Sequence, residues 1–240
     1  GLGEDFSNKE KLAKLLRFAS THGNSTQNVS LDDYVSRMKE SQEKIYYISA
    51  ESHGAGTSSQ HMEIFRKKGI EVLVLSDRID GWMISHLNEF DGKHMQDITK
   101  GELDLGDIDA EEDKKQQEEA SKTYENLINQ IKELLKDKVE DVRITNRLTD
   151  SPAFLVAGAH DMDAQMKKIM EAAGQVVPET KPSFGINTEH PLVKQLNDEQ
   201  NDDRFNDLTY VLFDQAALAS SEQLKEPGAF VSRLNKLLLD

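Results

Sequence analysis

Two glycines and one aspartate come closest to the spacing of a cofactor site. Gly54 and Gly56 lie between a predicted strand and a predicted helix, and Asp77 follows the next predicted strand. In dinucleotide-binding turns, glycines admit the pyrophosphate and an acidic residue binds the ribose. Here Ser59 replaces the third glycine, and no second mononucleotide-binding half follows. One interpretation is a nucleotide-binding enzyme that uses the Gly54/Gly56 loop and Asp77. The other is a surface loop without a ligand, and the pattern favours this second interpretation.

Other residue types that carry chemistry lack the necessary patterns. No two of the seven histidines have HxxxH spacing, and the chain contains no cysteine, so neither imidazole nor thiolate metal sites are indicated. The nucleophile-elbow and phosphate-loop motifs are also absent. The sequence therefore predicts no catalytic, cofactor-binding or metal-binding residue in this chain.

A methionine-rich helix is predicted over residues 161–173. One of its faces carries four apolar residues at helical spacing, Met162, Met166, Ile169 and Met170. Such a face normally covers a core, but flexible thioether side chains also suit binding surfaces that accept many shapes. Trp82, the single tryptophan, has the same two alternatives: a buried residue or a surface anchor.

Two amphipathic helices are predicted at the end of the chain, over residues 203–219 and 227–239. A two-helix hairpin cannot bury a wide apolar stripe alone, so pairing with a second copy would complete a four-helix bundle. The alternative is docking onto the same chain. The candidate interface residues are Phe205, Leu208, Leu212, Ala216, Phe230, Leu234, Leu237 and Leu238.

The elements of the first part predict a small α/β/α layer domain over residues 1–105. Two β-rich runs at residues 44–49 and 70–75 flank a helix that ends at Gly69, which is the pattern of a right-handed βαβ unit. Residues 51–59 are expected to form a loop. Further helices are expected at residues 7–20, with a Ser7–Glu10 capping box, from the N-cap Ser30 onward, and at residues 80–88.

A polar, charged linker at residues 100–122 marks the boundary to an α+β domain over residues 106–240. A helix at 123–136 precedes a predicted hairpin of strands at 139–148 and 152–157. A third strand at 184–187 and a helix at 189–198 capped by Thr188 follow. The overall prediction is an α/β fold with a small layered domain, then an α+β domain that ends in a helix pair.

The composition limits the partners of the chain. Its 44 acidic and 29 basic residues give a net charge of −15, which repels nucleic-acid backbones. No apolar run approaches the ~18 residues of a membrane helix, and no signal peptide is present. The lack of cysteine fits a reducing cytosol, so we expect a cytoplasmic protein that binds neither nucleic acid nor membrane.

Several ordered motifs resemble those of the bacterial ninety-kilodalton heat-shock chaperone family, HtpG. They extend over essentially the whole chain. They are the segments KLLRFAS at 14–20, SLDDYVSRMK at 30–39, KIYYI at 44–48, FRKKGIEVL at 65–73, EFDGK at 89–93, RLTDSPA at 147–153 and NTEHPLV at 187–193.

The resemblance implies a homodimeric chaperone of the stress response that binds unfolded client proteins and other chaperones. It implies that ATP and magnesium bind in an N-terminal domain outside this chain, so we expect a fragment without its own ATPase activity. The fragment would contain the small middle subdomain and the C-terminal dimerisation domain. Its final helices would form the dimer interface, and the methionine-rich helix with Trp82 would contact clients. A purely structural dimerisation module remains the other alternative.

Overall fold

The computed structural model describes residues 8–77, 79–103, 105, 111–162, 166–167, 170, 172–177, 180–220 and 222–239, without the side chains of 111–114. The chain divides into two compact units. The first contains residues 1–109 and 159–179, and the second contains residues 110–158 and 180–240. The segment 159–179, which the sequence analysis assigns to the second domain, thus belongs to the first unit.

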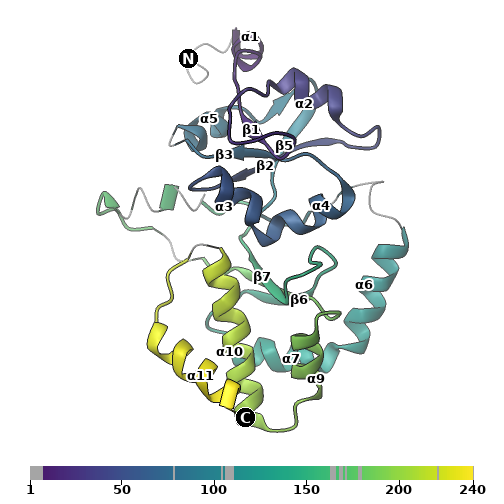
Figure 1. The fold of residues 1–240 in the computed structure, drawn as a ribbon, viewed down its shortest axis with the longest axis vertical. Coiled ribbons are helices and arrows are strands. Elements are labelled where there is room, and N and C mark those ends of the chain that lie inside the picture. The colour runs from purple at the N-terminus through teal and green to yellow at the C-terminus, as the bar shows by residue number, and fades with distance from the viewer. Residues whose placement is uncertain are drawn as a thin grey trace. The chain divides into compact units, whose positions relative to one another are not determined.

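A five-stranded sheet forms the centre of the first unit (Figure 1). The strand order is β1-β3-β2-β5-β4, and β2 is parallel to both β3 and β5, which confirms the predicted βαβ unit. The short edge strands β1 and β4 are antiparallel to their neighbours. The strands are β1 (Ala19–Ser20), β2 (Lys44–Ser49), β3 (Leu73–Leu75), β4 (Glu89–Phe90) and β5 (Lys93–Asp97).

Both faces of this sheet bury apolar side chains, because successive residues of a strand point to opposite faces. Leu73 and Leu75 of β3 belong to the cluster that includes residues of α2 and α5, whereas Val72 and Val74 belong to the cluster around α4. The result is the predicted α/β/α layering. The helical elements are α1 (Lys9–Ala13), α2 (Leu31–Arg37), α3 (His53–Ser58), the 3₁₀ helix η2 (Gln60–Met62), α4 (Glu63–Lys68) and α5 (Asp80–His86).

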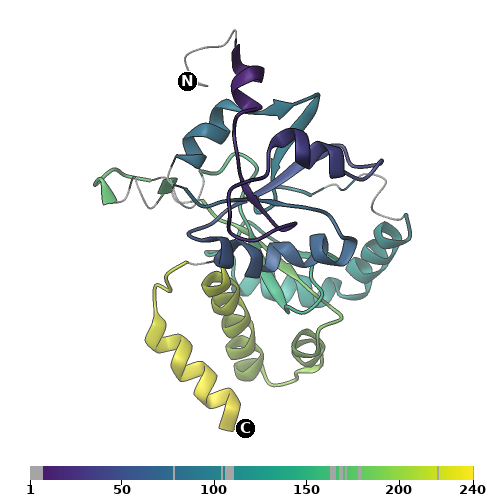
Figure 2. The ribbon, with the colours of Figure 1, turned by 45° about the horizontal axis from the view of Figure 1, so that its top comes forward.

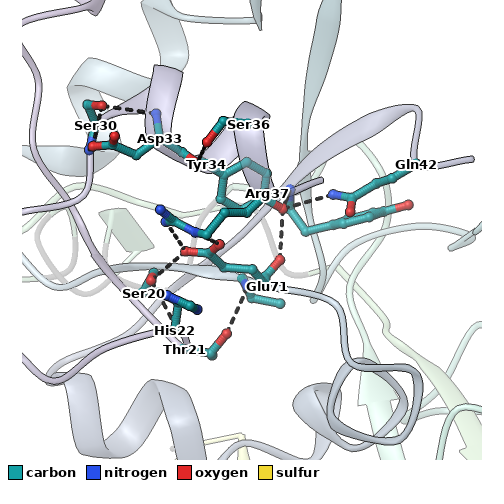
Figure 3. Close-up of polar contacts among 12 residues, drawn as sticks. Ser20, Thr21, His22, Ser30, Asp33, Tyr34, Ser36, Arg37, Gln42 and Glu71 are labelled. Atoms are coloured by element: carbon teal, nitrogen blue, oxygen red, sulfur yellow. Dashed lines mark hydrogen bonds and ion pairs between the residues drawn. The ribbon is translucent and has the colours of Figure 1, made fainter. Parts of the chain in front are cut away.

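Polar contacts around Glu71 fasten α2 to the sheet (Figure 3). The Glu71 carboxylate accepts two hydrogen bonds from Arg37, both 2.9 Å long, and one of 2.7 Å from the Ser20 hydroxyl. The buried Tyr34 hydroxyl donates to the Glu71 carbonyl and accepts from the Tyr46 amide. Helix α2 begins at the predicted N-cap Ser30, whose hydroxyl accepts from the Asp33 amide in a capping box.

Two predictions for the first unit are wrong. The expected helix at 7–20 contains only α1, because Ala19 and Ser20 pair with β3 as a strand; Ser7 lies outside the described residues. The expected loop at 51–59 contains α3, whose N-cap Ser52 accepts a hydrogen bond from the Ala55 amide. The small residues of this segment allow the helix to lie close to the sheet.

The second unit is built on a three-stranded sheet with helices packed against it. Its strand order is β6-β8-β7, with β6 parallel and β7 antiparallel to β8. The predicted β6–β7 hairpin is therefore wrong, because the buried residues Phe184 and Ile186 place β8 between the two strands. The elements are α6 (Glu111–Thr123), α7 (Glu125–Leu134), β6 (Asp141–Ile144), β7 (Ala153–Val156), β8 (Ser183–Ile186), α9 (Pro191–Asp198), α10 (Asp202–Ala219) and α11 (Pro227–Leu239).

The helices of the second unit follow the predictions with two corrections. Residues 111–122, which the sequence analysis expects to be part of a linker, belong to helix α6, which ends at Thr123. Helix α9 is capped by His190 rather than by Thr188, since the His190 ring nitrogen accepts a hydrogen bond of 3.2 Å from the Leu192 amide. Helices α10 and α11 form the expected final pair and lie beside each other in both views (Figures 1 and 2). The predicted class, an α/β unit followed by an α+β unit, is confirmed.

Candidate functional site

Helix α5 presents Trp82 to solvent. The helix is anchored from its other side by the buried side chains of Met83 and Leu87. Trp82 is 44% exposed, and the neighbouring Ile79 is 64% exposed. The Trp82 ring lies against the His86 ring, with 4.5 Å between centroids, and a His86 ring nitrogen lies 2.8 Å from the Trp82 carbonyl oxygen. The tryptophan is thus held in place at one edge while its remaining surface stays open.

The start of α5 is fixed by a partly buried carboxylate. The Asp80 side chain accepts a hydrogen bond of 2.9 Å from the Asp77 amide. Burial raises the pKa of Asp80, because water stabilises the charged form less well there, and the nearby Asp77 carboxylate raises this pKa further. Asp77 itself accepts a hydrogen bond from the Gln27 side chain, 2.8 Å long. Asp77 and Asp80 therefore shape the turn that carries Ile79 and Trp82.

The methionine-rich segment is described only in part. Met162, Met166 and Met170 are each partly buried, and residues 166, 167, 170 and 172 are helical. Ile169, the fourth residue of the predicted face, lies outside the described residues. The segment belongs to the same compact unit as Trp82. Partial burial is compatible with both alternatives from the sequence, so the role of these methionines stays a prediction.

Helix α10 contributes mainly to the core of the second unit. Leu208, Leu212 and Ala216 are buried together with residues of α7, β6 and β8, and Phe205 packs against the same cluster. These four positions lie on the face of α10 that meets the sheet. Of the predicted interface residues, those on α10 are therefore placed in an internal core.

Helix α11 is different, because none of its described residues is buried. Its residues Phe230, Leu234 and Leu237 are partly buried. Val231 and Leu238 are 51% and 75% exposed, and Leu239 is 87% exposed. Val231 was missed by the sequence analysis, although its i, i+7 spacing from Leu238 places both on one face of the helix.

The glycines of the nucleotide-like pattern have a structural role. A Cβ on Gly56 would lie 2.8 Å from Val74 Cγ1 and 3.3 Å from Ala50 Cβ, so glycine lets α3 pack directly on the sheet. Gly56 is buried, whereas Gly54 is exposed inside α3. The tight packing at Gly56 favours the interpretation of this segment as a structural element.

Among the described residues, no three His, Asp or Glu side chains lie close enough together to hold a metal ion. No helix among these residues is long and apolar enough to cross a membrane.

The described residues form an α/β unit followed by an α+β unit, and helices of both units present large apolar side chains to solvent. The family model "Hsp90 protein" matches residues 1–240, so the chain belongs to the Hsp90 family. Hsp90 proteins are chaperone ATPases, and the chain therefore has a chaperone-type function within the heat-shock response.

Proposed function

We propose that this chain supplies self-association to an Hsp90-type chaperone and that two copies meet through α11. One observation carries the proposal: α11 has apolar residues on its outer side but no buried residue. In a single copy Val231, Leu238 and Leu239 are exposed to water, and covering them with a second copy is favourable because apolar surface is removed from water. The same face on both copies gives an isologous contact of the kind common in homodimers.

The solution mass tests this proposal. Light scattering across a dilution series should give a dimer for the wild-type chain. The double variant Val231→Ser/Leu238→Ser should be a monomer that still unfolds cooperatively, because both side chains are exposed within one copy and lie outside its core. Leu15→Ser is the matched control, since Leu15 is 73% exposed on the first unit and should leave the dimer intact. A wild-type chain that is monomeric throughout, or a dimeric double variant, contradicts the proposal.

We further propose that Trp82 and Ile79 form part of a surface for non-native client proteins, with Met162, Met166, Ile169 and Met170 as the second part. The exposed indole and isoleucine side chain next to it support this role, since aromatic rings supply large contact areas at little entropic cost. Weak, adaptable contacts suit clients of varied sequence, and the negative charge of the chain keeps the complexes soluble.

Binding of an unfolded model client, followed by fluorescence anisotropy of the labelled client, tests this surface. Trp82→Ser should weaken binding severalfold without changing the melting temperature, and Met166→Ser/Met170→Ser should weaken it in the same direction. Leu15→Ser again serves as the control for an exposed apolar residue. If both variants bind the client with unchanged affinity, the client-binding proposal is wrong and the chain would be a purely structural dimerisation module. A loss of cooperative melting in the methionine variant would show that those residues form a core.

The parent protein would be a cytoplasmic bacterial chaperone of the HtpG type. In that protein ATP and magnesium would bind outside residues 1–240, and the chain would act as a fragment with the middle subdomain and the dimerisation domain. Calorimetric titration of the chain with ATP or NAD should show no binding. Saturable binding that Asp77→Ala abolishes would instead support the nucleotide-binding enzyme.

A further inference from the structure

A row of polar and aromatic side chains joins α11 to α10. Asp207, Tyr210 and Asp214 follow each other at i, i+3 and i+7 and therefore share one face of α10. The Lys236 ammonium lies 2.7 Å from Asp207, and the Arg233 guanidinium lies 3.9 Å from Asp207 and 3.8 Å from Asp214. The same guanidinium lies 4.4 Å from the centroid of the Tyr210 ring, within the range of a cation–π contact. We call these five residues the α10–α11 clasp.

The clasp is shielded from water on its α10 side. The side chains of Asp207 and Asp214 are only 18% and 13% exposed, and that of Arg233 is 27% exposed. Burial raises the pKa of Asp214, although Lys138 and Arg233 act in the opposite direction. Charge pairs with so little exposure contribute more to the position of the side chains than pairs at a free surface, while the exposed parts of Arg233 and Lys236 leave the pairs open to screening at high salt.

The clasp also contains both charged residues of α11, so the rest of the helix surface is uncharged. Arg233 and Lys236 are the only charged residues in the sequence from 227 to 239. Both pair with aspartates of α10, so the charges of α11 are neutralised within one copy. The exposed residues of this helix other than Lys236 are all uncharged: Pro227, Gly228, Val231, Ser232, Asn235, Leu238 and Leu239.

We propose that Arg233 is a positioning residue for self-association through α11. The proposal rests on the proposed function, in which the partner is a second copy of this chain. By holding α11 against Asp207, Asp214 and Tyr210, Arg233 turns Val231 and Leu238 outward and keeps its own charge out of the contact. An uncompensated charge buried between two copies would oppose their association, because its desolvation would not be offset by a partner.

Salt dependence distinguishes the clasp from the apolar contact itself. Raising the salt concentration to about 1 M shortens the Debye length to ~3 Å, which weakens partly exposed ion pairs, whereas apolar contacts are not weakened by screening. Screening of the repulsion between two chains of net charge −15 acts on the dimer with or without the clasp. High salt should therefore lower the affinity of the wild-type dimer relative to that of a dimer without the clasp.

The experiment measures the dimer dissociation constant by sedimentation at low and high salt. Arg233→Met should weaken the dimer about tenfold at low salt, and this difference from the wild type should become much smaller at high salt. Arg233→Lys, which keeps the charge, should recover most of the affinity. The double variant Arg233→Met/Asp214→Asn removes both charges, so no carboxylate is left without its partner. It should remain as weak a dimer as Arg233→Met. The melting temperature of each variant is recorded to confirm folding.

The outcomes separate the two proposals. A monomeric wild-type chain refutes self-association and the positioning role together. A dimeric wild-type chain whose dissociation constant is unchanged by Arg233→Met refutes the positioning role alone. Full recovery of affinity in Arg233→Met/Asp214→Asn also refutes it, because Arg233 would then serve only to compensate Asp214.

Discussion

The ring of Phe154 in β7 lies over Gly185, its partner residue in β8. A Cβ on residue 185 would fall 2.7 Å from Phe154 Cδ1 and still closer to Cε1. The guanidinium carbon of Arg147 lies 5.0 Å from the centroid of the same ring. Burial lowers the pKa of Arg147 to about 10. The sheet of the second unit thus depends on the absence of a side chain at position 185.

Gly185→Ala should therefore destabilise the second unit by about 1–3 kcal/mol, because Phe154 must leave its position or the strands must separate. Urea denaturation measures this loss in free energy of unfolding. Gly228→Ala is the control, since no atom lies within 4 Å of its Cβ position. Equal stability of the two variants would contradict the tight contact between Phe154 and Gly185.

Thr209 is fully buried in α10, and its hydroxyl has no hydrogen-bond partner among the described residues. Thr209→Val keeps the shape and removes the desolvated hydroxyl, so it should stabilise the chain by about 1 kcal/mol in urea denaturation. Thr21→Val is the matched control, because the Thr21 hydroxyl accepts a 3.0 Å hydrogen bond from the Val72 amide. The control should be destabilised; a loss of stability in Thr209→Val would show that its hydroxyl is satisfied.

The carboxyl group of Asp80 gives a pH-dependent prediction. Burial places its folded-state pKa above the ordinary value of 3.8, so the folded chain binds this proton more readily than the unfolded chain. The stability gained from protonation is present at low pH and is lost as the pH rises from 3.8 through the raised folded-state pKa. Asp80→Asn is always neutral and keeps an oxygen to accept from the Asp77 amide. Its free energy of unfolding should therefore improve relative to the wild type as the pH rises through this window. A constant difference would contradict the raised pKa.

Through its buried hydroxyl, Tyr34 of α2 joins β2 to Glu71, which lies two residues before β3. It donates to the Glu71 carbonyl over 2.7 Å and accepts from the Tyr46 amide over 3.0 Å. Tyr34→Phe leaves these buried groups without that partner and should cost about 1–3 kcal/mol of unfolding free energy. Ser36→Ala, which removes an exposed hydroxyl, should cost much less. Equal and small effects would mean that water replaces the tyrosine hydroxyl.

The sequence predicts those elements whose pattern depends on local signals. The N-cap at Ser30 and the C-terminal Gly69, with its φ of 61°, mark helix ends that the structure confirms. Strand β5 was missed, because its residues Lys93 to Asp97 are mostly polar and show no apolar alternation. The central place of β8 was also missed, since strand order depends on contacts between distant residues, which local patterns do not contain.

The exposed surfaces of α10 and α11 could be predicted only in part, because they too depend on contacts between residues that are distant in the sequence. Periodicity groups Leu208, Leu212 and Leu238 as apolar helix residues, but it does not say which of them meet a sheet. The structure buries the first two in a core and leaves Leu238 exposed. The clasp between Arg233 and Asp214 was also absent from the sequence analysis, because it depends on how α10 and α11 cross. The sequence offers one indication of it: Arg233 and Lys236 are the only charged residues from 227 to 239.

Disulfide crosslinking at α11 tests the central claim most directly, because the chain contains no cysteine of its own. Val231→Cys and Leu238→Cys place single thiols on the outward face, and Lys194→Cys places one on the exposed surface of α9 as a control. Under mild oxidation, at least one of the α11 variants should form covalent dimers much faster than the α9 variant. Crosslinking of both α11 variants no faster than that of the control would contradict self-association through α11.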